Sequence, residues 1–179
     1  MQIRQATALD APNIAPLIYD AIGDIANQLT NEKTVELAIA GIQTLIKQTN
    51  NRHTYLNTYV AEENGQLLGV IVLYDGATGK QLDAQHARTY NIIIDPEAHN
   101  DEYYIDTVCV HHSVRGQGIG TKLLQFAETQ GRKQGFTKLS LNVELEKLSA
   151  RKLYEKMGFV VTEPWTIIGE PFHHMVKEI

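Results

Sequence analysis

Apolar and polar residues follow two rhythms along the first fifty residues, one typical of a strand and one typical of helices. Ile3 to Ala6 alternates with a period of two, which predicts a short first strand. Asp10 followed by Pro12 has the pattern of a helix cap and first turn, and predicts a helix over residues 11–24. Residues 34–47 carry a broad apolar face at helical spacing, with Thr34 or Asn31 available as the cap, and predict a second helix.

A hairpin signal and then a looser stretch follow. Residues 58–62 and 67–74 are strand-like and are joined through Asn64-Gly65, a strong turn signal, so we expect two antiparallel strands. From residue 75 to residue 101 the pattern loosens, although residues 81–89 fit a helical turn or two. Connections of this length in a compact domain are usually functional or mobile.

The second half of the chain alternates strands with helices. The pattern predicts strands over residues 103–110, 136–143, 159–168 and 172–179, and helices over 121–134 and 148–157, the last ended by Gly158. With the first half, this gives an α/β fold: a mixed, mostly antiparallel sheet of six or seven strands with helices on both faces.

A glycine-rich turn, Arg-Gly-Gln-Gly-Ile-Gly at residues 115–120, joins the strand at 103–110 to the next helix. Such a turn directs unpaired backbone N–H groups and the positive helix end at one spot, which suits an anion such as a pyrophosphate. The nucleoside-triphosphate loop does not match, because it needs Gly-Lys-Ser/Thr after four residues. The dinucleotide fingerprint fails too, because Thr121 stands where its third glycine belongs.

The spacing Arg-x-x-Gly-x-Gly, formed by Arg115, Gly118 and Gly120, resembles the loop with which the GNAT superfamily of N-acetyltransferases binds the acetyl-CoA pyrophosphate. The preceding strand and residues 150–159, which read Ala-x-x-Leu-Tyr-x-x-x-Gly-Phe, are similar to the same family. Together these segments cover residues 103–160.

The resemblance implies a GNAT-like acyl-CoA N-acyltransferase fold in which the strands ending near Val110 and Val143 splay apart where the cofactor enters. It implies that backbone groups of the strand pair with the pantetheine arm, while Arg115 either contacts a phosphate or braces the loop. Where the family commonly carries an asparagine, this chain has Lys147, so that cofactor contact is not expected. The residues expected at acetyl-CoA are Val108, Val110, Arg115, Gly116, Gln117, Gly118, Gly120, Thr121 and Asn142.

Acetyl transfer to an amine needs an uncharged nitrogen, a stabilised oxyanion and a proton for the departing thiolate. Tyr154 matches the family tyrosine near the thioester sulfur, which implies a general acid; the alternative is plain packing. Asp106 is the first choice as base, because this polar residue in an apolar strand shares a face with Val108 and Val110. The alternative is a hydrogen-bonded aspartate at the mouth of the sheet, and Glu144 is the runner-up as base.

Composition narrows the partners. With 179 residues, 43% of them hydrophobic, the chain suits one domain, which the resemblance implies is a single N-acetyltransferase domain over residues 1–179. A net charge of −5 without a basic run argues against nucleic acid or a membrane surface and mildly favours a cationic substrate. No apolar stretch approaches the roughly 20 residues that span a bilayer, and no signal peptide is evident. The lone Cys109 fits a reducing compartment, so we expect a cytoplasmic protein.

Seven histidines raise the question of a metal, above all His111-His112 and His173-His174. Adjacent histidines in a strand point to opposite faces and cannot easily share one ion, so no metal site is expected. His174 is instead a candidate proton relay at the acceptor pocket. Four acidic residues of predicted loops are expected to be solvated rather than functional: Glu97, Asp101, Glu102 and Glu170.

We therefore expect an acetyl-CoA-dependent N-acetyltransferase that acts by direct attack of a primary amine in a ternary complex, because Cys109 is a poor acyl-enzyme nucleophile. The acceptor, a small-molecule or peptide amine, is not specified by the sequence. One alternative is a noncatalytic acyl-CoA-binding or regulatory domain of the same fold. Another is an acyltransferase that uses a longer acyl group or an alcohol acceptor. The resemblance also implies a homodimer through the last strands.

Overall fold

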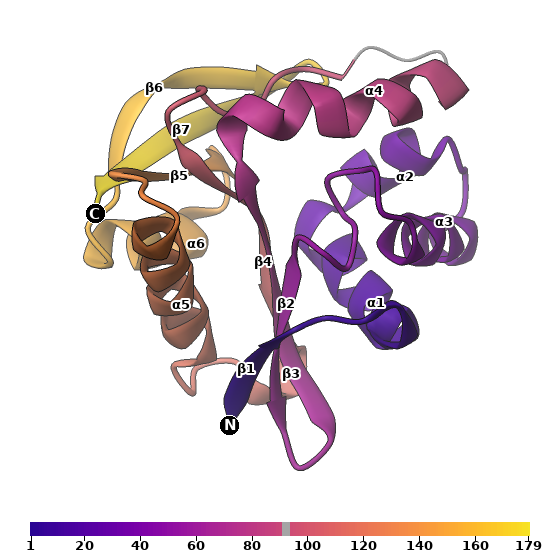
Figure 1. Cartoon of the computed structure of the whole chain (residues 1–179), viewed down its shortest axis with the longest axis horizontal. Coiled ribbons are helices and arrows are strands. Elements are labelled where there is room, and N and C mark those ends of the chain that lie inside the picture. The colour runs from indigo at the N-terminus through magenta and orange to yellow at the C-terminus, as the bar shows by residue number, and fades with distance from the viewer. Residues whose placement is uncertain (91–93) are drawn as a thin grey trace.

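The computed structural model describes residues 1–90 and 94–179 of the chain. Figure 1 shows one sheet with helices α1 to α3 on one side and α5 and α6 on the other. The strands are β1 (Gln2–Gln5), β2 (Thr58–Glu63), β3 (Gln66–Asp75), β4 (Tyr103–Val110), β5 (Lys138–Glu144), β6 (Val160–Ile167) and β7 (Glu170–Glu178). The α-helices are α1 (Ala11–Ile22), α2 (Asp24–Thr30), α3 (Val35–Lys47), α4 (Gly79–Tyr90), α5 (Ile119–Lys133) and α6 (Leu148–Lys156).

The first predicted helix ends earlier than expected and is followed by a second one. Helix α1 stops at Ile22 because Gly23 adopts φ 54° and ψ −129°, and α2 begins directly afterwards. The sequence analysis did not anticipate α2. Asp10 occupies the cap position of α1, but its carboxylate accepts from the Thr7 backbone N–H at 2.7 Å and so caps the preceding turn instead.

Helix α3 begins at one of its two predicted caps. The Thr34 hydroxyl oxygen accepts a hydrogen bond from the Leu37 backbone N–H at 3.3 Å. Asn31, the other candidate, ends α2 in the left-handed conformation with φ 55°. The two residues thus divide the connection between them: asparagine tolerates positive φ, and threonine supplies the cap oxygen.

The predicted hairpin is present, and the helix after it is longer than predicted. Strands β2 and β3 pair antiparallel, and Asn64 and Gly65 both have positive φ, 51° and 77°, as a tight hairpin turn requires. Helix α4 runs over Gly79–Tyr90 rather than a turn or two, because good helix formers sustain it although its apolar pattern is weak. Residues 91–93 of the loosely patterned connection lie outside the described residues.

The sheet follows the order β1-β2-β3-β4-β5-β7-β6, so the predicted mixed α/β sheet is confirmed with seven strands. Only β4 and β5 pair in parallel, while every other neighbouring pair is antiparallel. This parallel pair covers only the registers Tyr103 to Leu139, Tyr104 to Ser140 and Ile105 to Leu141. Beyond it, the two strands part.

Two apolar clusters hold the helices onto the sheet. On one face, Ile14 and Ile18 of α1 and Ile42 of α3 pack with valines of β2 and β3. On the other face, Leu123 and Leu124 of α5 pack with isoleucines and leucines of β3, β4 and β5. Neighbouring residues of a strand point to opposite faces, so the central strands contribute to both clusters. Because helices pack on both faces of the sheet, the position of β4 within it is fixed.

None of the helices in the described part of the chain is long and apolar enough to cross a bilayer. Strand β6 lies at one edge of the sheet and exposes Val160 and Val161. The homodimer through the last strands stays a prediction.

Candidate functional site

A cavity of about 1330 Å³ opens where β4 and β5 diverge. It is lined by the ends of β4 and β5 that no longer pair with each other, by the glycine-rich turn, and by α2 and α6. The predicted splay is therefore present. It separates residues 106–110 of β4 from residues 142–144 of β5. Pockets for one small ligand usually measure about 300–1,000 Å³, so this cavity has room for two reactants.

The glycine-rich turn points backbone donors into this cavity. Gly116 and Gly118 have φ of 80° and 78°, and Gly118 is the cap residue of α5. No side chain in the described part of the chain caps that helix, so its first N–H groups are left for a ligand. Of the predicted residues, Gly116, Gly118, Gly120 and Thr121 line the cavity, whereas Gln117 is exposed and does not.

Arg115 braces the turn. Its Nε donates to the Val110 carbonyl oxygen at 3.0 Å, and its guanidinium forms an ion pair with Asp20 of α1. The side chains of Arg115 and Asp20 are each about half exposed. A surface pair of this kind is worth about 0–1 kcal/mol, so an incoming phosphate could compete with Asp20 for the guanidinium.

The end of β4 lines the cavity with all five residues from Asp106 to Val110. Val108 and Val110 share a face and pack against the α5 cluster. Asp106 does not share that face as predicted, because the register with β3 shifts at this residue, and its carboxylate lies beside Arg52 and His53 instead. Beyond Ile105, the edge of β4 that faces β5 has no strand paired with it. An extended ligand can therefore lie where the ladder is missing.

A buried cluster of charges closes the other end of the cavity. Arg52, in the connection between α3 and β2, has a side chain only 6% exposed. It forms ion pairs with Asp83 and Glu97, and its Nη1 lies 3.4 Å from Oδ2 of Asp106. One guanidinium thus serves three carboxylates. Burial opposes charge on Arg52, but these neighbours outweigh it and hold its pKa above the usual value.

The carboxylates of this cluster differ from each other. Burial raises the pKa of Glu97, although Arg52 and the Tyr104 hydroxyl, which donates to Glu97 at 2.9 Å, oppose that rise. Burial acts on Asp106 too, but His53 and Arg52 outweigh it and hold the pKa of Asp106 well below its usual range. Asp106 is therefore a stable anion and, by itself, a weak base.

His53 is the polar side chain that the cluster leaves unsatisfied. It is 4% exposed and lines the cavity. Its Nε2 lies 3.2 Å from Oδ1 of Asp106, an ion-pair distance, yet the ring is not aligned for a hydrogen bond, and neither ring nitrogen has a hydrogen-bond partner among the described residues. Buried polar atoms are nearly always satisfied, so a reactant is the natural partner.

Tyr154 lies on α6, across the cavity. It lines the cavity, and burial raises the pKa of its hydroxyl to about 12. Cys109 is nearby on β4, and burial raises the pKa of its thiol to about 11. Both groups thus stay protonated at neutral pH, which leaves Cys109 a poor nucleophile.

Two further candidates are engaged with protein groups. Asn142 lines the cavity, but its Nδ2 donates to the Glu97 carbonyl oxygen at 2.8 Å and its Oδ1 lies 2.7 Å from His174 Nδ1. Its predicted cofactor contact stays a prediction. Glu144, the runner-up base, lines the cavity and pairs with Lys147 at 2.7 Å.

The histidine expectations need correction. His111 and His112 lie beyond the end of β4 rather than within it, and their rings are 4.4 Å apart instead of on opposite faces. His174 is fully buried and contacts Asn142 and Glu102, and it does not line the cavity. Asn142 separates His174 from the cavity, and a side-chain amide does not pass a proton on, so His174 is not placed to act as the predicted relay.

Three residues of the buried charge cluster were not expected from the sequence. Arg52 and His53 were passed over in a polar connection, and Glu97 was expected to be solvated, whereas it is largely buried against Arg52. The one available signal was an adjacent arginine and histidine in a segment without periodicity. Their partners are 31 to 54 residues away in sequence, beyond the reach of local patterns.

Comparison with known sequences identifies a family. A sequence model of the Acetyltransferase (GNAT) family matches residues 24–159. The uncharacterized N-acetyltransferase YhfO of Bacillus subtilis (strain 168) is 27% identical over 159 residues, which cover 89% of each chain. A shorter match, 36% identical over 70 residues, is to GCN5-related N-acetyltransferase 6, chloroplastic, of Arabidopsis thaliana; it covers 39% of this chain and only 24% of that protein.

Solved structures agree with this result. An N-acetyltransferase from Staphylococcus aureus Mu50 superimposes with a TM-score of 0.83 at 25% identity, over 98% of this chain and 100% of that one. PaiA N-acetyltransferase from Thermoplasma acidophilum, solved in complex with coenzyme A, has a TM-score of 0.61 at 18% identity, over 99% and 98% of the two chains. The second likeness shows the fold alone.

Proposed function

The chain belongs to the GNAT acetyltransferase family, and we propose that it transfers the acetyl group of acetyl-CoA to a primary amine. One observation carries this proposal: a single cavity joins backbone donors suited to a pyrophosphate with a buried histidine and carboxylate suited to an amine. The family membership and the coenzyme A bound by the Thermoplasma protein of the same fold support acetyl-CoA as the donor.

In this proposal the cavity divides by charge. Arg115, Lys147 and Lys156 line the cavity, and Arg115 and Lys147 pair with Asp20 and Glu144. The N–H groups from Gly118 to Thr121 would hold the pyrophosphate, and the free edge of β4 at Val108 would pair with the amide-rich pantetheine arm. At the acceptor end, Arg52 is outnumbered by the carboxylates it serves. This excess of negative charge favours an acceptor that arrives as an ammonium ion.

An ammonium ion must lose a proton before it can attack. We assign this step to His53, with Asp106 as the group that stabilises the imidazolium that forms. The lowered pKa of Asp106 suits an anion that stays ionised better than one that takes the proton itself. Hydrogen bonds in sites without substrate are often poorly aligned and tighten on binding, which fits the 3.2 Å separation of the two side chains.

The neutral amine would then attack the thioester carbonyl carbon, forming the C–N bond, and collapse of the tetrahedral intermediate would break the C–S bond. Tyr154 would donate a hydrogen bond to the departing sulfur. Its pKa of about 12 exceeds the ordinary thiol value of about 8.5, so it would stabilise the thiolate rather than give up its proton outright. The proton that completes CoA–SH comes from the nitrogen as the amide forms.

Titration calorimetry with acetyl-CoA and CoA, followed by a thiol-release screen over an amine panel, tests the proposal. We expect binding of both and turnover with one class of amine. His53→Gln and Tyr154→Phe should lower kcat while CoA affinity is kept. Tyr19→Phe, which removes a hydroxyl outside the cavity, is the matched control. Failure to bind CoA would overturn the proposal, and binding without turnover of any amine would favour a noncatalytic acyl-CoA-binding domain.

A further inference from the structure

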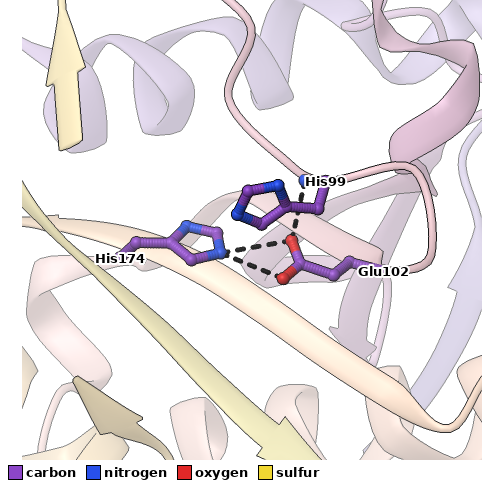
Figure 2. A group of neighbouring side chains, drawn as sticks. All are labelled: His99, Glu102 and His174. Carbon is purple, nitrogen blue, oxygen red and sulfur yellow. Dashed lines mark hydrogen bonds and ion pairs between the residues drawn. The ribbon is translucent and has the colours of Figure 1, made fainter. Parts of the chain in front are cut away.

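Two histidines and a glutamate converge outside the cavity. His99 and Glu102 lie in the segment before β4, and His174 lies on β7 (Figure 2). One ligand atom from each lies within 4.8 Å of the other two. We propose that these three side chains, the His99–Glu102–His174 cluster, bind a divalent transition-metal ion of the Zn²⁺ type.

The hydrogen bonds around His174 determine which nitrogen carries its proton. Asn142 Nδ2 donates to the Glu97 carbonyl at 2.8 Å and contacts the Tyr104 hydroxyl at 3.1 Å, so the Asn142 oxygen must face His174. That oxygen lies 2.7 Å from Nδ1, which must therefore be an N–H donor. In a neutral ring the lone pair then sits on Nε2. A fixed tautomer of this kind is the usual outer-shell support of a metal-binding histidine.

The Nε2 lone pair faces a carboxylate. Figure 2 shows dashed lines from this nitrogen to both oxygens of Glu102, at 3.1 and 3.2 Å. A lone pair and a carboxylate face each other stably only with a cation between them, which is either a proton on Nε2 or a metal ion. Ligands that share a tetrahedral Zn²⁺ at about 2.0–2.2 Å lie about 3.3–3.5 Å apart, close to these separations.

Glu102 is oriented for this role. Its Oε2 accepts from the Ser140 hydroxyl at 2.8 Å and from the His99 backbone N–H at 2.9 Å. Metal-ligating carboxylates are typically held by such hydrogen bonds. Oε1 has only His174 Nε2 within hydrogen-bond distance among these partners and keeps lone pairs for an ion.

His99 completes the set from the exposed side. Its side chain is 49% exposed, so it has the freedom to move the ångström or so that full coordination needs. Its Nε2 lies 2.8 Å from Glu163 Oε1, which is itself 44% exposed and available as a fourth ligand or as an orienting partner. Two neutral histidines with Glu102 and Glu163 carry two negative charges, which a dication neutralises. Imidazole with carboxylate ligands suits Zn²⁺ better than Mg²⁺ or Ca²⁺.

The ion would fix one wall of the cavity. The segment before β4 is tied to β6 and the turn after it by two hydrogen bonds, Trp165 Nε1 to the Pro96 carbonyl at 2.8 Å and Ile168 N–H to Asp95 at 2.9 Å. The same segment presents Glu97 to Arg52. A metal joining His99 and Glu102 to His174 would tie the segment to β7 as well, so its role is to hold this end of the cavity in place and not to touch the reactants.

The only tryptophan of the chain makes the test direct, because the Trp165 ring lies 4.6 Å from that of His174 and 5.1 Å from that of His99. Tag-free protein stripped with chelator would be titrated with Zn²⁺ by calorimetry and with Co²⁺ by visible absorption. Mg²⁺ serves as the comparison ion. We expect one equivalent of Zn²⁺ to bind, Co²⁺ to give the strong visible bands of a low-coordinate site, and Trp165 emission to change in step with occupancy.

His99→Ala should weaken Zn²⁺ binding by at least about tenfold. Because the His99 side chain is half exposed, this variant should fold. The matched control replaces both His111 and His112, whose neighbouring rings could hold an ion adventitiously, with alanine; it should bind like the parent. Binding that survives in His99→Ala but is lost in the control would overturn the proposal. Absence of Zn²⁺ and Co²⁺ binding would overturn it too, and would leave Glu102 and His174 as an ion pair bridged by a proton.

Discussion

Replacing Arg52 with methionine should destabilise the protein strongly at neutral pH. Methionine keeps much of the volume of the side chain and removes its charge. The guanidinium is 6% exposed, donates from Nε to Asp83 at 2.7 Å, and also serves Glu97 and Asp106. Breaking a buried pair by removing one partner costs about 3–5 kcal/mol, because the charge left behind is uncompensated. Here three carboxylates lose the same partner, so we expect a loss in the upper half of that range.

The loss should shrink as the pH falls. In the parent protein the pKa of Asp106 is held below its unfolded value, so its stabilising contribution is present above that unfolded value and is lost at acid pH. Without Arg52, the folded-state pKa of Glu97, already raised by burial, should rise further. A group whose folded pKa is raised stabilises the fold below its unfolded pKa, and that contribution is lost as the pH rises through the folded pKa. The variant and the parent should therefore converge on acidification.

Urea unfolding followed by Trp165 fluorescence at about pH 5.5 and about pH 8 measures both effects. Arg132→Met is the matched control, because Arg132 pairs with Glu128 on the surface of α5 while Lys177 keeps a second contact with that glutamate. An exposed pair of this kind is worth about 0.5 kcal/mol. A loss for Arg52→Met no larger than that of the control, or a loss that does not narrow at the lower pH, would refute the argument.

Four further outcomes follow from single positions. Leu123→Ala, at a fully buried site beneath the sheet, should cost about 2–5 kcal/mol in urea unfolding, whereas Leu148→Ala, 60% exposed, should cost about 0.5 or less. Gly118→Ala meets no neighbour but must hold φ 78°, so about 1–2 kcal/mol of strain should weaken CoA binding in calorimetry. Because the pKa of Tyr154 is about 12, kcat measured across a buffer series should show no fall from its ionisation below about pH 10, and an alkaline limb that disappears in Tyr154→Phe would contradict this. Cys109→Ala should keep its thiol-release activity, since a thiol with a pKa of about 11 cannot carry an acyl intermediate at neutral pH; loss of turnover with intact CoA binding would speak for an acyl-enzyme.

Elements with a local physical cause were predicted well. The hairpin at Asn64-Gly65 depends on two residues that tolerate positive φ, and the cap at Thr34 depends on one hydroxyl, so a few letters suffice. Helix α2 was missed because Gly23 was treated as part of one helix instead of as its break. Helix α4 was underestimated because its sequence is polar, and an apolar stripe is the signal that sequence reading follows.

The His99–Glu102–His174 cluster lies beyond the reach of a sound local rule. Neighbouring strand residues do point to opposite faces, and His173 and His174 differ in burial as that rule requires. The rule excludes a shared ion between adjacent residues, but it does not exclude one shared with a distant segment. His99 and Glu102 reach His174 across more than seventy residues of sequence. Only the fold brings them together, and no spacing in the sequence marks the meeting point.

The two ends of the cavity differ in how far a local sequence pattern can predict them. In the proposed function, backbone N–H groups bind the pyrophosphate at one end, so the sequence needs only glycines that allow the turn, and Gly116 and Gly118 stand at a recognisable spacing. At the acceptor end, side chains from separate elements share one guanidinium, and their protonation depends on how much water the fold removes from each. Asp106 illustrates the consequence: a polar residue in an apolar strand marked it as a candidate, whereas the register shift that turns it toward Arg52 and His53, and its weakness as a base beside them, follow only from the fold. In the function proposed above this end binds the acceptor, so variants of His53 and Arg52 should alter which amine is used more than variants of the glycine turn do.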